Sequence, residues 1–599
     1  MPGSEIELNL SIPDQTLSSL SFSNHTSSEI KKWVKDLPLA NVGEISRQLY
    51  QAIIELNQLV LNPGVRMQLL ELLRPPIDYV CKELSKHFLN QSVVLTEKQQ
   101  KVANLAQAIQ IHLASGYKIV MVETVPGMTN EKNRKGFACA AHRMISEYGQ
   151  VLLRANQLYT AIPKNIWLEM HQVYKVAEAE DLLKYTVTDE HNKQLSESRI
   201  DEVYKCNILL SCCRPNQLRQ HDIQLAFEAF QLWANHCNIG ADIADDSVFI
   251  MNMEQDLPCR YKSLMNGPLT SQYYGFDTRE LVELISKHIE LAEKKSTSGS
   301  ELQLPRQVTD ILLNHFNQAF GILTKRTFKR IENEGSLSLC IGLSASHYYT
   351  SGKVEFHTQM FHSGASNSDT ENNIFLTQAR RQHDAWSEAA DVGGHQATTP
   401  ADSPISFNRA PEVTGGESYP SYVVPLVNTS PGGYCLQWQG EVPSNIQAGE
   451  ILSLRESEKQ PWSVAVIRWI RHIKKKGTQI GIELLAPGAK PCGVQLLHKT
   501  GDPSEYLRGM LLPELSGIGQ PATLITPRLP FQSGHKVSIK FSDAETKCQL
   551  EMRVSATSSF NQFELSKSTH IRHEQDNITD GSPNSQTSED DFDSLWPTL

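Results

Sequence analysis

The sequence predicts an α+β multidomain protein in which an N-terminal all-α helical domain precedes two antiparallel β-units. Apolar residues recur at intervals of three and four through the first half of the chain. From about residue 335 onward, short alternating runs separated by Gly, Pro and charged residues indicate strands. With 599 residues, of which 40% are hydrophobic and 21% are charged, the chain is long enough for several domains.

The helical domain is expected at residues 28–293, behind a disordered N-terminus of residues 1–27. Consecutive helices joined by short polar breaks favour antiparallel pairs or a tetratricopeptide-like stack. A strand within Ser247–Met253 is expected to close this domain. The clearest helical stripe consists of Ile45, Leu49, Ala52, Ile53, Leu56 and Leu59.

A small antiparallel barrel is expected at residues 305–495, after a linker at 294–304. A helix at 305–320 is expected to open this unit, and its continuation carries Arg326 and Arg330. The residues from Gly335 to Tyr349 alternate with the period of a half-buried strand. Further strands are expected at 421–427, 434–438, 449–454, 462–470 and 477–485.

A polar insertion, a second β-unit and an acidic tail complete the predicted organisation. Residues from about 361 to 418 are rich in Ser, Asn, Asp, Gly and Thr, and they form a polar insertion between the first two barrel strands. Residues 496–566 hold a second β-unit. The acidic tail at 567–599 is expected to be disordered, and it either has no role or docks as a short peptide on a partner.

Two short motifs provide the candidate binding residues. Arg326 and Arg330 are one helical turn apart, and each guanidinium can grip a phosphate bidentately or stack on a base. Asn428, Ser430 and Gly433 form an NxSxxG element, in which a carboxamide, a hydroxyl and a glycine-opened turn can contact a ligand lying on a sheet. Together they describe a site for an anionic guanine nucleotide.

Each motif also has an interpretation without a ligand. Arg326 and Arg330 could form a solvated basic end to the preceding helix, complementing its dipole. The residues from Asn428 to Gly433 are turn formers that a hairpin would use by itself. The strands on both sides of the second motif favour the ligand interpretation, because they would hold its polar groups on a rigid surface.

These features resemble the PilZ domain of bacterial cyclic-di-GMP receptors. The resemblance implies that Arg326 and Arg330 clamp the phosphates and guanines from a loop entering the barrel, while Asn428, Ser430 and Gly433 contact the guanine. The family usually places its two motifs about two dozen residues apart, whereas here the gap is 428 − 330 = 98 positions, most of which the polar insertion fills. The matching elements are the two motifs and the strands GEILSL, VIRW and GIELL.

Other classes of function lack their sequence signals. No phosphate-binding loop, dinucleotide fingerprint or HExxH helix is present, so we expect no enzyme. The pairs His221-Asp222 and His383-Asp384 lack the further ligands of a metal phosphohydrolase, and we expect no metal or cofactor. A net charge of −11 argues against general nucleic-acid binding.

The N-terminus lacks the pattern of a secretory signal, no window predicts a membrane span, and eleven irregularly spaced cysteines suit a reducing cytoplasm. The resemblance therefore implies a cytoplasmic receptor that binds cyclic-di-GMP and signals to an unidentified protein partner through the helical domain or the acidic tail. The expected outputs are attachment, motility or pili. The alternatives are a PilZ-like scaffold that has lost its nucleotide and, third, a hydrolase hidden in the helical half.

Overall fold

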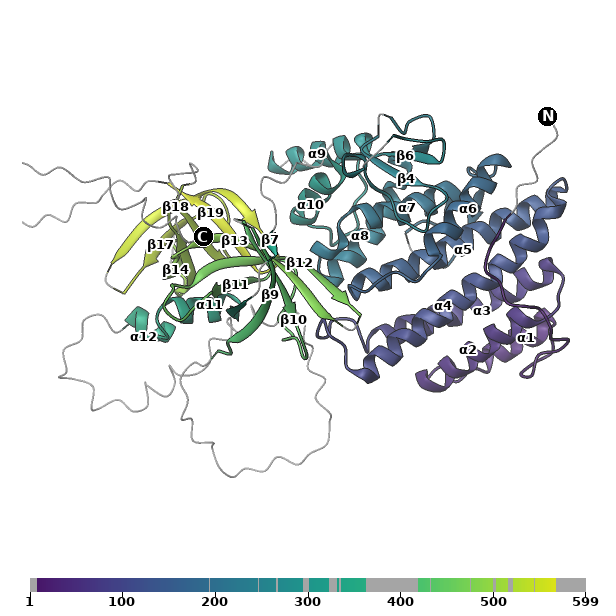
Figure 1. Ribbon diagram of the computed structural model, residues 1–599, viewed down its shortest axis with the longest axis horizontal. Coiled ribbons are helices and arrows are strands. Elements are labelled where there is room, and N and C mark those ends of the chain that lie inside the picture. Colours follow the sequence, from purple (N-terminus) through teal and green to yellow (C-terminus); the bar gives the residue numbers. More distant parts are fainter. Residues whose placement is uncertain are drawn as a thin grey trace, which may run out of the picture.

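The computed structural model describes residues 8–566, except 193, 246, 266–267, 295–300, 323–330, 333–334, 362–418, 431, 475, 499–502, 515–520 and 543. The described chain forms a helical domain followed by two β-barrels (Figure 1). The helical domain occupies one end of the molecule and both barrels occupy the other. The predicted fold class is confirmed.

Helices form most of the N-terminal domain, and their apolar stripes make its core. The six residues of the stripe predicted between Ile45 and Leu59 are at most 1% exposed. Thr96 and Gln99 form a capping box that starts α4, and Asn62 caps α3. The helices are α1 (Ser27–Lys35), α2 (Val42–Gln58), α3 (Pro63–Ser85), α4 (Glu97–Thr124), α5 (Glu131–Gln157), α6 (Ile166–Ala179), α7 (Ile200–Cys212), α8 (Gln220–Trp233), α9 (Arg279–Glu293) and α10 (Asp310–Phe320).

Two small sheets interrupt these helices, whereas the sequence predicts a single strand in this domain. One is a hairpin of β1 and β2, and the other is an antiparallel sheet of order β3-β6-β4-β5. The strand expected within Ser247–Met253 is confirmed as β4, whose residues are all buried. The strands are β1 (Thr186–Thr188), β2 (Glu197–Arg199), β3 (Asn238–Gly240), β4 (Phe249–Asn252), β5 (Arg260–Tyr261) and β6 (Tyr273–Asp277).

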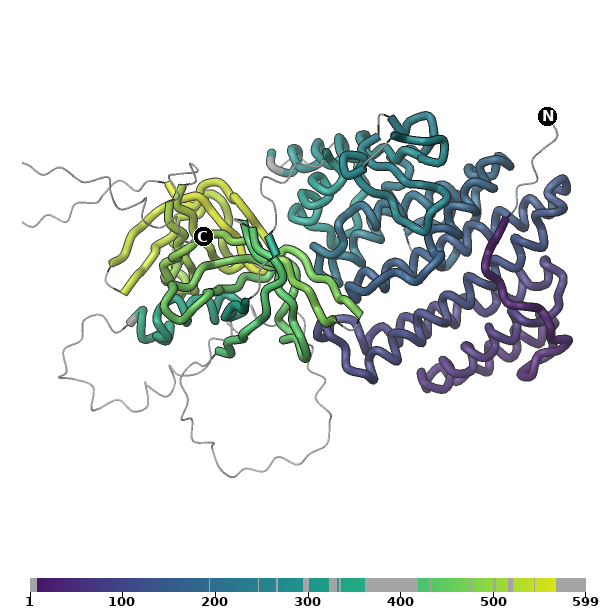
Figure 2. Tube along the Cα trace, in the orientation of Figure 1, coloured from purple at the N-terminus to yellow at the C-terminus, as the bar shows by residue number. Residues whose placement is uncertain are grey.

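The N-terminal segment is ordered from residue 8, so the prediction of disorder is wrong for residues 8–26. Leu10 is buried, and the Asn9 amide donates a hydrogen bond to Oε1 of Gln172 (3.1 Å). The segment runs along the helical domain in an extended path (Figure 2). Its contacts are with residues far away in sequence, which is why it has no periodic pattern. Residues 1–7 lie outside the described part of the chain.

Helix α10 packs into the helical domain, whereas we expected it to open the barrel unit. Its Phe316 and Phe320 rings lie 5.1 and 5.6 Å from the ring of Phe230 on α8. The Thr278 hydroxyl donates to the Phe320 carbonyl and ties the end of α10 to the start of α9. The apolar face of α10 thus completes the helical core.

The first barrel consists of six antiparallel strands in the order β10-β13-β12-β11-β8-β9, closed by the pairing of β9 with β10. A short strand, β7, pairs with the C-terminal half of β9 beside β8. The strands are β7 (Ile331–Glu332), β8 (Ser336–Ile341), β9 (Tyr422–Ser430), β10 (Gly433–Trp438), β11 (Ile451–Arg455), β12 (Ser463–Ile473) and β13 (Gly477–Pro487).

The strand expected from Gly335 to Tyr349 ends early. Gly342 has a φ of +95°, which breaks the extended chain after β8, and α11 (Leu343–Thr350) follows. Helix α11 contacts β8 and β11 of the first barrel and β14 and β15 of the second. It is followed by α12 (Phe356–Phe361). Helix α11 therefore lies where the barrels meet, and α12 contacts β14 of the second barrel through Gln359 (Figure 1).

The second barrel is closed in the order β14-β15-β16-β19-β18-β17. All of β14 pairs with β15 or β17, so the predicted boundary after Gln495 cuts a strand that belongs to the second barrel. Hydrophobic alternation continues from one barrel into the next, and only the pairing shows where the boundary lies. The strands are β14 (Lys490–Leu496), β15 (Leu507–Leu512), β16 (Thr523–Pro527), β17 (Lys536–Lys540), β18 (Glu545–Ala556) and β19 (Phe560–Leu565).

All three units meet around Arg219, which precedes α8. Its Nε donates to the Ala448 carbonyl (3.1 Å), and its Nη2 lies 3.1 Å from Oε2 of Glu450, which directly precedes β11. The same Nη2 donates to Oγ of Ser559 in the second barrel (2.5 Å), and Ser559 donates to Glu450 (2.6 Å). One guanidinium thus links the helical domain to both barrels.

Membrane-spanning helices and metal-binding clusters are both absent from the described residues. None of the helices found there has the length and apolar character needed to cross a membrane. No three His, Cys, Asp or Glu side chains in the described ranges come together in a metal-binding arrangement.

Candidate functional site on the first barrel

The second motif lies at the junction of two paired strands. Asn428 and Ser430 are in the last part of β9, and Gly433 is the first residue of β10. The backbone turns between them, and Ser430 pairs with Gly433. Arg326 and Arg330 lie outside the described residues.

The described chain resumes directly after Arg330, at β7, and β7 pairs with the strand that holds the second motif. In β7, Ile331 pairs with Thr429 and Glu332 pairs with Asn428. Because Ile331 is the next residue after Arg330, the arginine segment leads into a strand paired with the NxSxxG element. The 98 intervening positions therefore do not separate the motif ends in space.

Strand register assigns the three described motif residues to one face of the barrel. Residues directly opposite each other on paired strands point to the same face, and successive residues alternate. Leu426 and Leu436 form a pair that belongs to the internal core. An irregularity between Leu436 and Cys435 brings Asn428 opposite Cys435, on the other face. The pair of Ser430 with Gly433 shares that outer face with Asn428.

Gly433 allows β10 to approach β13 closely. Its φ is +151°, and a Cβ at this position would lie 2.0 Å from the Ile482 carbonyl oxygen. The backbone of β13 cannot move away without breaking the barrel, so only glycine fits. This packing requirement is independent of any ligand.

The polar side chains of the motif differ in their partners. The Ser430 hydroxyl donates to the Gly433 carbonyl (3.2 Å), which stabilises the turn. The Asn428 carboxamide is half-buried and has no hydrogen-bond partner among the described residues. Its donors and acceptor are therefore available on the outer face.

Two residues that sequence reasoning did not single out share this face. Gly481 on β13 pairs with Cys435 on one side and with Trp469 on the other. A Cβ at Gly481 would lie 1.9 Å from Nε1 of Trp469, so the indole lies directly over this glycine. The half-buried indole adds an aromatic surface beside the polar motif. The signal lay in the VIRW and GIELL strands, but only their register shows that Trp469 covers Gly481.

Charged groups on neighbouring strands complete the face. Glu483 is opposite Gly433 in the register and forms an ion pair with Arg468, which occupies an irregularity in β12. Tyr434, between Gly433 and Cys435 in β10, points to the opposite face and packs against the internal core, and its hydroxyl donates to Glu456 (3.0 Å). Burial, followed by the Glu456 charge, raises the pKa of Tyr434 to about 12, so this hydroxyl stays protonated at neutral pH.

Comparison with known proteins connects this geometry to a family. Three family models together match most of the chain: the N-terminal domain of the cyclic-di-GMP receptor FimW at residues 28–244, its middle PilZ domain at 248–491 and its C-terminal β-barrel domain at 492–568. The cyclic-di-GMP receptor FimW of Pseudomonas aeruginosa PAO1 is 40% identical over 609 residues, covering 99% of both chains. The chain belongs to the FimW family. No solved structure matches it.

The FimW family domains follow the order of the observed units, although the middle model begins at residue 248 and so includes β4 to β6, α9 and α10, which pack with the helical domain. The middle PilZ model includes all strands of the first barrel and the outer face described above, so the resemblance to PilZ proteins is confirmed. The C-terminal model starts at Cys492, inside β14, and covers the second barrel. The N-terminal model covers the helical bundle from α1 to α8.

Proposed function

We propose that this chain is a receptor that binds cyclic-di-GMP on the outer face of the first barrel. The proposed contacts are Arg326, Arg330, Asn428, Ser430 and Gly433. The observation that carries the proposal is the pairing of β7 with β9, because it joins the end of the arginine segment to the NxSxxG element. The family relationship supports the same ligand, since the P. aeruginosa relative is named a cyclic-di-GMP receptor.

Each proposed contact has a chemical reason. The two guanidiniums supply the positive charge that a cyclic dinucleotide with two phosphates requires, and they can form bidentate hydrogen bonds. The Asn428 carboxamide offers both a donor and an acceptor to a guanine edge. Trp469 provides a half-buried aromatic surface on the same face, on which a base can stack.

We further propose that the receptor is cytoplasmic, performs no catalysis and passes its signal to a protein partner that acts on attachment, motility or pili. The first barrel is well placed to transmit a change. Its internal core is continuous with that of the helical domain. Near the end of β12, the His472 amide donates a hydrogen bond to the carbonyl of Tyr159 in the helical domain (2.9 Å). Binding of the ligand through Arg326 and Arg330 would bias this contact between two arrangements.

Calorimetry of the full chain with cyclic-di-GMP tests the site. Arg326→Ala, Arg330→Ala and Asn428→Ala should each weaken binding by about 1.5–3 kcal/mol, or roughly ten- to a hundredfold. The arginine variants lose hydrogen bonds to the phosphates, and the asparagine variant loses those to a guanine edge. The matched control is Arg306→Ala, which removes an exposed arginine ahead of α10. It should leave the affinity unchanged.

The competing scaffold function makes the opposite prediction. If the unmodified chain produced no binding heat with cyclic-di-GMP, the receptor proposal would be abandoned and a barrel without nucleotide would remain. If the chain cleaved the dinucleotide, chromatography of the mixture would reveal a linear product, and the non-catalytic proposal would be wrong.

A further inference from the structure

The outer face proposed to bind a ligand with two negative charges itself contains a carboxylate. Glu483 on β13 lies directly opposite Gly433 in the strand register, and its side chain is 48% exposed. The Cα atoms of such cross-strand neighbours are about 4.5–5.5 Å apart. A ligand that touches Gly433 would therefore lie within reach of the Glu483 charge, and an unpaired carboxylate at this position would repel its phosphates.

A β-bulge in β12 brings a cation to this carboxylate. The register passes directly from Ile467 to Trp469, so Arg468 is an extra residue with no opposite residue on β13. In a regular strand, residues 467 and 469 would point to the same face. Here Ile467 belongs to the internal core, whereas Trp469 lies over the outer face. The guanidinium of Arg468 forms an ion pair with Glu483 on that outer face.

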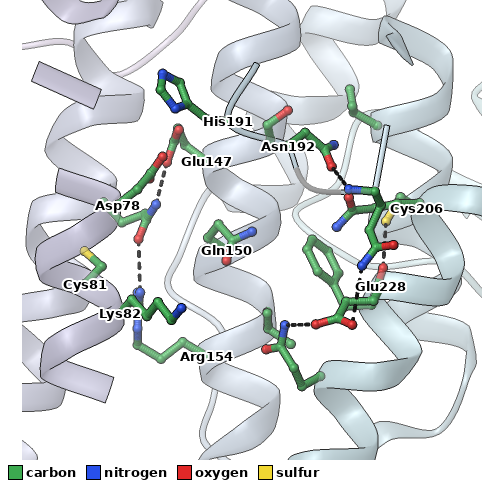
Figure 3. A pocket seen from close by; sticks show the side chains of 18 of the residues that line it. Asp78, Cys81, Lys82, Glu147, Gln150, Arg154, His191, Asn192, Cys206 and Glu228 are labelled. Carbon is green, nitrogen blue, oxygen red and sulfur yellow. Dashed lines mark hydrogen bonds between the residues drawn. The ribbon is translucent and has the colours of Figure 1, made fainter. Parts of the chain in front are cut away.

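This ion pair differs from the buried pairs of the helical domain. Figure 3 shows Glu147 among the residues that line a cavity in that domain. Its carboxylate lies 3.1 Å from Arg74, and both side chains are at most 7% exposed, so removal of either partner would leave a buried charge unpaired. The side chains of Arg468 and Glu483 are 39% and 48% exposed. Water can solvate each of them alone, and the fold therefore does not require the pair.

We propose that Arg468 is a positioning residue for the nucleotide site: by pairing with Glu483, it neutralises a carboxylate that would otherwise repel the ligand. This inference rests on the proposed function. Arg468 acts through Glu483 and does not itself contact the ligand. The positive charge of Arg326 and Arg330 is then not offset by a bare carboxylate opposite Gly433.

Two other roles for Arg468 lead to different outcomes. If its guanidinium left Glu483 and bound a phosphate directly, its contribution to affinity would persist in a chain without the Glu483 charge. If the pair served only to hold the bulge, its loss would change stability and leave affinity unaltered. A double-mutant cycle over the two residues separates these roles from charge neutralisation.

The test is calorimetry of the full chain with cyclic-di-GMP. Arg468→Ala should weaken binding roughly fivefold or more, because a bare carboxylate then faces the phosphates. Arg468→Lys keeps the charge and should retain most of the affinity. Combining Arg468→Ala with Glu483→Gln should restore the affinity to within about twofold of the unmodified chain. Unchanged affinity in Arg468→Ala would overturn the proposal, as would a double variant that binds as weakly as Arg468→Ala.

Ionic strength provides a second readout. The Debye length is about 8 Å at 0.15 M salt and about 3 Å at 1 M, so salt should screen the repulsion from an exposed carboxylate. The difference in affinity between Arg468→Ala and the double variant should therefore shrink as salt is added. A difference that salt did not alter would show that charge is not its cause and would contradict the proposal.

The matched control is Arg47→Ala on α2, which removes an exposed arginine from its ion pair with Glu44. It should bind cyclic-di-GMP as tightly as the unmodified chain. Circular dichroism and thermal unfolding establish that each variant is folded. If the unmodified chain did not bind the nucleotide, the proposed function itself would fail. If it bound but the double variant showed no recovery, only the role of Arg468 would be wrong.

Discussion

The two barrels each close with six strands in the described part of the chain, and the NxSxxG element lies on the outer face of the first. The first barrel shares its internal core with the helical domain, whereas the second has a separate core around Val494, Leu524 and Val537. An apolar cluster that includes Val466 and Met510 joins the barrels. The first barrel therefore lies between the two other units and contacts both.

This difference shows that the barrel architecture does not itself determine function. In the second barrel, Gln562 donates to Thr523 (2.9 Å), and Oδ1 of Asn561, unpartnered within the described ranges, is buried rather than presented on the outer face. In the first barrel, the Asn428 carboxamide remains without a partner among the described residues. Substitutions of these outer-face groups should therefore be able to abolish ligand binding while the barrel stays folded.

The largest effect is expected for Gly433→Ala. The new Cβ would lie 2.0 Å from a backbone oxygen, so β10 and β13 must separate, at about 3 kcal/mol or more in unfolding free energy. Thermal unfolding and cyclic-di-GMP calorimetry should both reveal a loss. Gly432→Ala is the control, because a Cβ there meets nothing within 4 Å. If the two variants were equally stable, the close approach would not be essential.

Gly509→Ala should produce the complementary result in the second barrel. Its Cβ would lie 2.4 Å from Cγ2 of Val494, a side chain that can shift, so we expect about 1–3 kcal/mol of destabilisation. Cyclic-di-GMP affinity should be unchanged at temperatures where the protein remains folded. A large loss of affinity would show that the second barrel takes part in binding.

Arg219→Ala should loosen the junction of the three units by about 2 kcal/mol, because Glu450 and Ser559 lose a charged partner. Limited proteolysis should cleave faster between the helical domain and the barrels. Nucleotide binding should persist, since Arg219 contacts none of the motif residues. Arg219→Lys retains the charge but lacks the guanidinium fork, and it should give an intermediate result. Unchanged proteolysis in both variants would contradict the role of this junction.

Acid should weaken the contact between the barrels through His347 on α11. Burial, followed by the Arg508 charge, lowers the pKa of His347 to about 3. The unfolded chain, with a pKa near 6.5, then binds more protons between these values, so stability is complete above pH 6.5 and falls below it. The expected loss is about 2 kcal/mol at pH 5. Hydrogen exchange of β14 and β15 should accelerate on acidification. His347→Gln should reduce the pH dependence of the exchange rate. The control, His357→Gln at an exposed position, should leave it unchanged.

The smallest effect is expected for Ser430→Ala, which removes one hydrogen bond at a partly exposed turn. The loss should be about 0.5–1.5 kcal/mol in unfolding free energy. A larger decrease in cyclic-di-GMP affinity than in stability would indicate that the hydroxyl contacts the ligand. Chemical denaturation and calorimetry on the same variant separate the two contributions.

The sequence predicted the order of the units, most strands and the motif, because each of these has a local signal. The apolar run in β12 and the turn residues from Asn428 to Gly433 are examples. The sequence did not predict that α10 completes the helical core, that β14 begins the second barrel, or that residues 8–26 are ordered. In each case the deciding contacts join positions far apart in the chain, and an amphipathic pattern does not specify its partner.

The sequence by itself determined which groups are available: two arginines, an asparagine, a serine and a glycine in the order of a PilZ domain. Tertiary structure alone decided that β7 meets β9 and that Trp469 covers Gly481 on the same face. The physical reason is the distance along the chain over which each interaction acts. Propensity and periodicity act over a few neighbouring residues, whereas strand register and helix packing are fixed by burial of the whole core.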